Sequence, residues 1–239
     1  PISMQKMLRD GMWDYPSRQV HNGVIVNPIE LLDLAIVDVG EYQKKAYNFI
    51  IESLSKKYPI LKDPTKGLSY TALESPLQAL NMVYPHNEME MEDRDDDIHL
   101  YMYGKKGLNR SMFYNEQTKS EFRYKDVTLQ NFGRIFSPSE IGKYSGKIAN
   151  ICNSIRTSKG IIFVYSQYID GGGVPVALAL EEMGITKYGG RSLFKTPPTK
   201  QIDAITMSSD NVTNPAKYIM ITGDINLTTK ERLELEMKA

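Results

Sequence analysis

The chain has 239 residues, of which 41% are hydrophobic, and its 29 basic residues balance 29 acidic ones. A zero net charge creates no long-range field that attracts a polyanion, so a nucleic-acid surface must come from local basic patches. The single cysteine, Cys152, excludes an internal disulfide and a cysteine-based zinc site, and it fits a reducing compartment. We expect neither a bilayer-spanning segment nor a secretory signal, because no apolar stretch has the required length or flanks.

The N-terminal part of the sequence predicts two short strands followed by one helix. Val24–Val26 and Leu34–Val39 are apolar runs of the kind that form strands. Between positions 41 and 57, apolar residues recur at helical spacing and lysines occupy the opposite side. This spacing predicts an amphipathic helix.

Prolines and then acidic residues dominate the chain from position 58 to position 97. The prolines divide the first part into turns around one predicted helix, 75–83, with Pro76 at its start. Positions 88–97 contain seven acidic residues and one basic residue. Such a run is typical of a solvated, mobile loop.

Three short aromatic segments follow, at 100–103, 111–114 and 121–124, and turn-rich stretches separate them. They predict a small antiparallel meander. Basic residues interleave with these rings: Lys105, Lys106, Arg110, Lys119, Arg123, Lys125 and Arg134. Cations that contact phosphates beside rings that stack on bases form a non-specific nucleic-acid surface, for which Lys105, Lys106 and Arg110 are the candidates. A meander with its rings inward and its lysines outward explains the pattern equally well, so both interpretations stay open.

The second half of the sequence predicts alternating helices and strands. A helix is expected from Lys147 to Arg156, with Cys152 on its core-facing side. The continuous apolar run from Ile161 to Tyr165 is followed by glycines and by a helix with Pro175 near its first turn. This order predicts a buried parallel strand that leads into a crossover helix.

The remaining elements are a loop, a strand and a final helix. The stretch 190–214 has two consecutive prolines and no sustained periodicity, so we expect an irregular excursion. Tyr218–Thr222 is the next predicted buried strand. Thr228–Glu231 matches a capping box that starts the final helix.

Several patterns resemble nucleotide or metal sites, but each lacks a required feature. Gly142–Lys147 has three residues between its glycines where a phosphate loop has four. Asp95–Asp97 lacks the preceding apolar strand that fixes magnesium-binding carboxylates. The histidines, at positions 21, 86 and 99, are too far apart in the sequence to support a metal cluster or a triad. Gly171–Gly173 occupies the place of a dinucleotide loop, but Val176 at the third glycine position favours a tight strand-to-helix turn.

The run from Gly160 reads G-I-I-F-V-Y-S-Q-Y, and Y-I-M-I-T-G-D-I-N-L-T-T-K-E-R-L follows after the excursion. These segments resemble the opening of the second RecA-like lobe of superfamily II helicases, closest to the Snf2-like branch. Within that branch the chain is similar to helicases of nucleocytoplasmic large DNA viruses, the group of the poxvirus early transcription factor small subunit and nucleoside triphosphatase I. The run G-R-I-F-S-P-S-E-I-G-K-Y-S-G-K-I at 133–148 supports this closer assignment.

The resemblance implies an α/β fold with two parts. Residues 141–239 are expected to form a partial RecA-like parallel sheet with flanking helices, as the incomplete start of the second lobe. Residues 1–140 are expected to form a mixed α+β linker or inserted domain that contains the small meander. Because the sequence starts at Pro1 and its last predicted helix stops at Ala239 without a following strand, we expect a segment of a longer protein.

Six residues match family motifs that lie by the nucleic-acid track or the interlobe cleft. The end of the fourth helicase motif matches Ser166, Gln167 and Tyr168. The following strand and helix match Thr222, Gly223 and Arg232. The resemblance therefore implies nucleic-acid contacts at these positions.

The sequence lacks the phosphate loop, the acidic magnesium motif and the arginine-finger motif on which phosphoryl transfer depends. We therefore expect no catalytic residue in this segment, and we expect ATP and Mg²⁺ to bind only in the full-length parent. The resemblance implies a DNA helicase or translocase of viral transcription that prefers DNA to RNA, contacts RNA polymerase, and works in the cytoplasmic viral factory or the virion.

Two other classes of function stay open. The first is a stand-alone, non-catalytic module that binds nucleic acid or polymerase through the meander and the acidic loop. The second is a small α/β transferase that uses the turn at Gly171. A phosphate loop upstream and an arginine-finger motif downstream would select the helicase, whereas nucleotide binding by this piece alone would select the transferase.

Overall fold

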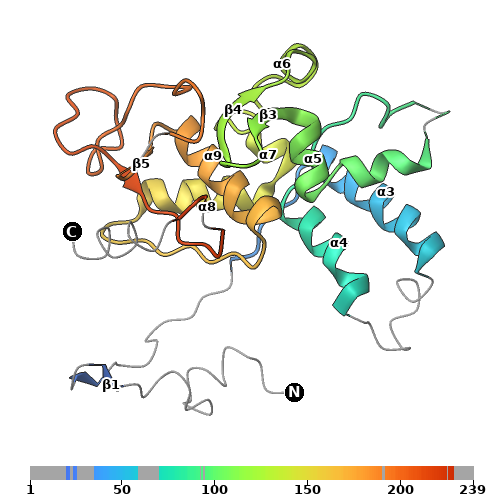
Figure 1. Cartoon of the computed structure of the whole chain (residues 1–239), viewed down its shortest axis with the longest axis horizontal. Helices are drawn as coiled ribbons and strands as arrows, with labels where there is room; N and C mark the ends of the chain where they lie inside the picture. Colours follow the sequence, from blue (N-terminus) through green and yellow to red (C-terminus); the bar gives the residue numbers. More distant parts are fainter. Residues whose placement is uncertain are drawn as a thin grey trace. The chain divides into compact units, whose positions relative to one another are not determined.

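Two short strands, β1 (Val20–His21) and β2 (Val24–Ile25), pair antiparallel in the first of two compact units, Pro1–Val37. The second unit, Asp38–Ala239, holds the other described elements (Figure 1). The computed structural model describes residues 20–21, 24–25, 35–58, 70–91, 93, 95–189, 192–224 and 226–228. No helix among these residues has the length and apolar character needed to cross a membrane.

Helix α3 (Glu41–Lys57) has the bounds that its apolar spacing predicts. Helix α4 (Tyr70–Asn81) begins earlier than expected, so Pro76 lies inside it and not at its start. The side chain of Gln43 joins the two helices, because its Nε2 donates to the carbonyls of Ala79 and Leu80 at 3.4 Å each. The helices share a small core with the 3-10 turn that follows them.

That 3-10 turn, η3 (Asp96–Tyr101), lies where the sequence predicts a mobile acidic loop and the first strand of a meander. The predicted strand at 100–103 is wrong, because the 3-10 turn takes its place and buries Ile98 and His99. The acidic run ends at the start of this turn, and Asp93, Asp95 and Asp97 are exposed, as expected of a solvated loop. The backbone of Met102 is also engaged, since its carbonyl accepts from the amide of Tyr84 at 2.7 Å. The segment 100–103 therefore joins the small core instead of a sheet.

The other two aromatic segments form a hairpin directly after helix α5 (Gly104–Ser111). Strand β3 (Met112–Asn115) pairs antiparallel with β4 (Ser120–Tyr124), with Met112 opposite Tyr124. The predicted three-stranded meander is thus a two-stranded hairpin. Tyr114 and Phe122 stack across it with ring centroids 4.5 Å apart.

One buried helix, α9, lies in the larger core, and irregular segments with two short strands follow it along the chain (Figure 1). The elements in chain order are α6 (Asp126–Phe132), α7 (Ile141–Tyr144), α8 (Gly146–Thr157), the π-helical turn η4 (Ile169–Gly173) and α9 (Val174–Glu182). The predicted α8 is confirmed, with Ser145 as its N-cap and Cys152 buried. Helix α9 is confirmed with Pro175 in its first turn, and all its residues are buried. The core around it also contains Met82 and Tyr84, so it joins residues on both sides of position 140.

The predicted buried strand from Ile161 to Tyr165 is wrong. These residues form no strand, and the exposed fractions of Ile161, Phe163 and Tyr165 are 104%, 83% and 79%. An apolar run becomes a buried strand only where a neighbouring strand and a covering layer exist, and the described residues supply neither here. The exposure still alternates, because Ile162 and Val164 are only 42% and 39% exposed.

The predicted strand Tyr218–Thr222 is only partly present. Strand β6 (Lys217–Tyr218) pairs parallel with β5 (Thr186–Lys187), and the pairing stops there. Met220 is buried, while Ile219 and Ile221 are 44% and 59% exposed. At the other end of the chain, residues 35–39 form no strand either, and Ile36 is 96% exposed.

The excursion expected at 190–214 is irregular from residue 192 onward, where it is described. The buried carboxylate of Asp203 binds several backbone amides near its centre. Asp203 accepts hydrogen bonds from four backbone amides, those of Ile205, Thr206, Thr213 and Asn214. These bonds hold the pKa of the Asp203 carboxyl well below its ordinary value. Charge-assisted bonds of this kind take the place of a strand ladder. The predicted capping box, Thr228–Glu231, extends beyond the described residues.

Two adjacent glutamates at the end of α9 fasten the hairpin and the later segments to this helix. Glu182 accepts from the Tyr124 hydroxyl at 2.6 Å and from two nitrogens of Arg134 at 3.2 and 2.6 Å. Glu181 accepts from the amides of Leu193 and Phe194, at 2.7 and 3.0 Å. The Tyr218 hydroxyl also donates to Glu181 at 2.9 Å. Both carboxylates are buried and fully engaged.

Replacing Glu182 should destabilise the protein strongly, because it leaves the Arg134 charge and the Tyr124 hydroxyl without their buried acceptor. For Glu182→Ala we expect a loss of about 2–3 kcal/mol in the free energy of unfolding, measured by urea denaturation followed by circular dichroism, because the Tyr124 hydroxyl stays buried while Arg134 is 42% exposed to water. The control is Glu140→Ala, which removes an exposed pair with Lys143 and should cost at most about 1 kcal/mol. Equal losses in the two variants would contradict this account of Glu182.

Candidate nucleic-acid interface

A groove of about 580 Å³ lies between helix α5, the start of helix α6 and the segment that precedes the acidic run. Three of its lining residues are cations, Lys106, Arg110 and Lys125. The others are Pro85, Asn87, Tyr101, Asn109, Ser111, Val127, Thr128 and Phe132. None of the described lining residues is a carboxylate, in a chain with as many acidic as basic residues.

Helix α5 places two of the cations on one face. Lys106 and Arg110 are four residues apart, so their side chains project from the same side of the helix. The opposite side is buried and includes Gly107 and Leu108. A Cβ atom at Gly107 would come within 2.3 Å of the Tyr84 ring, so only glycine lets the helix pack this closely.

Helix α6 brings the third cation to the groove through its contacts with the end of α5. The amide of Lys125 donates to the carbonyl of Ser111 at 3.1 Å, and the hydroxyl of Thr128 donates to the same carbonyl at 3.0 Å. Both helices are thereby fixed at Ser111. Lys125 follows directly on Tyr124, whose hydroxyl is held by Glu182, so the core also fixes this wall of the groove.

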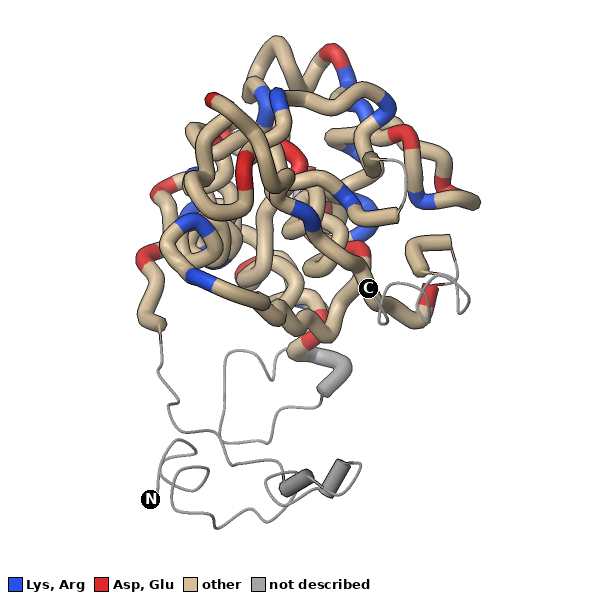
Figure 2. Tube along the Cα trace, turned by 90° about the vertical axis from the view of Figure 1, so that its left-hand side faces the viewer, with Lys and Arg blue, Asp and Glu red and all other residues tan. Residues whose placement is uncertain are grey.

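The groove cations are free of acidic partners within the described part of the chain. Lys106 lies over the Tyr101 ring at 5.7 Å, and Lys125 lies over the Phe113 ring at 5.0 Å. Such contacts orient a cation and leave its charge uncompensated. Positive and negative positions intermingle along the described chain (Figure 2), and the groove brings three positive side chains into one lining.

Three of the other predicted cations are neutralised by partners, whereas Arg123 lies over the Phe113 ring at 5.0 Å. Lys105 pairs with Glu116 at 3.0 Å, although it neighbours Lys106 in the sequence. Lys119 pairs with Asp170 on η4, and Arg134 pairs with Glu182. Of the three cations selected from the sequence, the structure therefore brings Lys106 and Arg110 together and directs Lys105 away.

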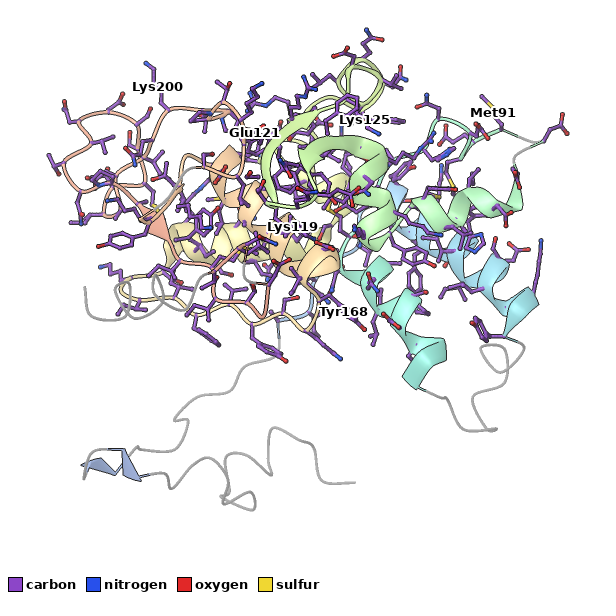
Figure 3. The ribbon with its side chains drawn as sticks, viewed as in Figure 1. Met91, Lys119, Glu121, Lys125, Tyr168 and Lys200 are labelled. Carbon is purple, nitrogen blue, oxygen red and sulfur yellow. The ribbon has the colours of Figure 1, made fainter. Side chains whose placement is uncertain are left out.

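The residues assigned by the helicase resemblance lie elsewhere. Ser166 forms a local turn with Tyr168, whose carbonyl accepts from the Ser166 hydroxyl at 3.0 Å. Thr222 forms a similar turn, since its hydroxyl accepts from the amide of Asp224 at 3.1 Å. Gln167 and Gly223 lie in these two turns, and Arg232 lies outside the described residues. None of the described members of this set lines the groove, and Figure 3 shows Lys125 and Tyr168 well apart.

The triple glycine at 171–173 is a site of close packing. A Cβ at Gly171 would lie 2.6 Å from Oε1 of Gln78, and one at Gly172 would lie 2.0 Å from Oγ of Ser166. Close packing therefore explains these glycines without a bound nucleotide. Among the described residues, no group of three or more His, Cys, Asp or Glu side chains is placed to hold a metal ion.

Sequence reasoning missed several residues of the groove. Lys125 belongs to the interleaved cations but was not selected, and Asn87, Val127 and Phe132 carry no signal in the sequence. They come together only because α6 folds back onto the end of α5. The sequence predicts a turn for the stretch 104–110 that holds Lys106 and Arg110, whereas the structure has helix α5 there, so the shared helix face of these two cations was not anticipated.

His86 lies next to the groove-lining residues Pro85 and Asn87 and is neutral at neutral pH. Burial lowers the pKa of His86 from its ordinary value near 6.5, and Arg110 lowers it further, while Glu88 opposes the shift. Its Nδ1 accepts from the amide of Glu88 at 3.2 Å, an interaction that requires the unprotonated nitrogen. His86 thus adds no positive charge to the groove at pH 7.

Comparisons of the chain with protein-family models, with curated proteins and with solved structures each found no match.

The lowered pKa of His86 predicts a loss of stability in mild acid. The unfolded chain binds a proton near pH 6.5 while the folded protein resists it, so stability should fall as the pH drops through the folded pKa. We expect the pH dependence of the melting temperature between pH 7 and pH 5 to be shallower in His86→Asn, whose amide oxygen can accept from Glu88 at either pH. Identical pH profiles for the two proteins would contradict this role of His86.

Proposed function

We propose that this chain is a nucleic-acid-binding segment of a superfamily II, Snf2-like DNA helicase or translocase that serves viral transcription. The nucleic-acid part rests on one observation: Lys106, Arg110 and Lys125 converge on one groove whose described lining residues include no carboxylate. Ammonium and guanidinium groups in this arrangement neutralise backbone phosphates and release their counterions. DNA is the proposed substrate in preference to RNA.

The helicase part of the proposal rests on the resemblance of the run from Gly160 and of the run from Tyr218. One feature of the structure is compatible with a partial RecA-like sheet, because β5 and β6 are parallel neighbours with the excursion between them. ATP and Mg²⁺ would bind the full-length parent, and this segment alone would not hydrolyse ATP.

A stand-alone, non-catalytic module is the second candidate, and one observation favours it. The described residues that line the groove all lie between positions 85 and 132, before the region that resembles a helicase. That region thus contributes no described residue to the groove. RNA polymerase is a further proposed partner in either case, as is a location in the cytoplasmic viral factory or the virion.

Removing the groove cations should weaken nucleic-acid binding. We expect Lys106→Ala, Arg110→Ala and Lys125→Ala each to weaken the binding of a labelled oligonucleotide, measured by fluorescence anisotropy. Each should also reduce the slope of log K against log salt concentration by about 1, because one phosphate contact is lost.

Two further variants serve as controls for this measurement. Lys200→Ala removes an exposed lysine of the excursion that lies away from the groove (Figure 3), so binding should stay unchanged. Lys105→Ala should have a smaller effect than Lys106→Ala, because Glu116 already neutralises Lys105. Equal losses in all five variants, or no measurable binding by the unaltered chain, would refute the proposed function.

A further inference from the structure

The groove has apolar walls beside its cations, and a phosphate alone does not explain them. Tyr101 and Val127 are 45% and 55% exposed, although both are large apolar side chains. Pro85 and the partly buried Phe132 extend the same lining. Apolar and aromatic walls in a concave site gain free energy when they cover the flat face of a ligand.

The size of the groove also exceeds what a phosphate needs. Its volume of about 580 Å³ falls in the range of about 300–1,000 Å³ that is typical of small-molecule sites. The lining also includes the side-chain amide of Asn87. Its Oδ1 accepts from Nδ2 of Asn131 at 3.2 Å, so its own N–H groups can donate to a ligand. The lining thus combines cations, apolar walls and a side-chain amide.

We propose that the groove binds an unpaired nucleotide of a single-stranded nucleic acid. The base lies against Tyr101, Val127 and Phe132, and the flanking phosphates contact Arg110, Lys106 and Lys125. Stacking and apolar contact accept any base, so the preference is for single strands and not for a sequence. This inference rests on the proposed function and specifies its substrate.

A duplex cannot make the same contacts with the groove. Its bases are stacked and paired inside the helix, so it presents phosphates and sugars to a concave surface and leaves the apolar walls uncovered. To fill them it must unstack a base, which costs a few kcal/mol. Single strands expose their bases without this cost, and the groove therefore discriminates between the two forms.

The test compares three labelled probes of equal length by fluorescence anisotropy with the complete chain: a thymidine single strand, a duplex, and an abasic single strand. We expect the thymidine strand to bind at least fivefold more tightly than either of the others. Tyr101→Ala should weaken binding of the thymidine strand by roughly 5- to 100-fold, the range for loss of one stacking contact. Binding of the abasic strand should be unchanged in this variant.

Tyr101→Phe keeps the ring and should bind the thymidine strand about as tightly as the unaltered chain. Comparison with Tyr101→Ala therefore distinguishes a loss of stacking from a folding defect. Equal affinities for the three probes would overturn the inference, because they would show that the groove recognises phosphates alone, while the proposed function would stand. Tighter binding of the duplex would likewise overturn it. Failure of all three probes to bind would refute the proposed function itself.

Discussion

The fold depends on the two buried carboxylates that end helix α9. A buried charge is tolerated only when hydrogen bonds replace its lost hydration, and Glu181 and Glu182 obtain these bonds from segments far apart in the sequence. The hairpin, the segment after position 192 and strand β6 are each bound to one helix end in this way. Helix α9 can be apolar on every other side because these partners and the core enclose it.

Tyr124 connects the buried carboxylate of Glu182 to the wall of the groove. Tyr124 ends strand β4, and its hydroxyl is held by Glu182 at 2.6 Å. The next residue, Lys125, begins the wall of the groove and is fixed to Ser111 through its amide. The position of the third cation is therefore determined by the core and not by a flexible loop, which is the preorganisation that a binding site needs.

Helices α3 and α8 were predictable from the sequence because their periodicity is a local property, whereas helix α5 occupies a stretch that was predicted to be a turn. The bounds of α3 and the place of α8 follow from apolar spacing within one helix. Strands depend on partners that the local sequence does not reveal, so the same reasoning failed for Ile161–Tyr165 and for 100–103. In the first case no partner strand is present among the described residues, and in the second the backbone of Met102 binds Tyr84.

The candidate site was predictable to a similar extent. Lys106 and Arg110 were identified because they are part of an interleaved basic and aromatic run. The pairing of Lys105 with Glu116, by contrast, depends on the hairpin turn and could not be inferred from spacing. The apolar walls were also invisible, since Val127 and Phe132 join Tyr101 only after α6 folds against α5.

The central claim is that nucleic acid binds the described surface at the groove. The most direct measurement is an NMR titration of the labelled chain with a short thymidine strand. The account predicts that the largest shift changes occur at the amides of α5, of Lys125 and of the first turn of α6. Changes concentrated at Ser166–Tyr168 and Thr222–Gly223, with α5 unaffected, would contradict it.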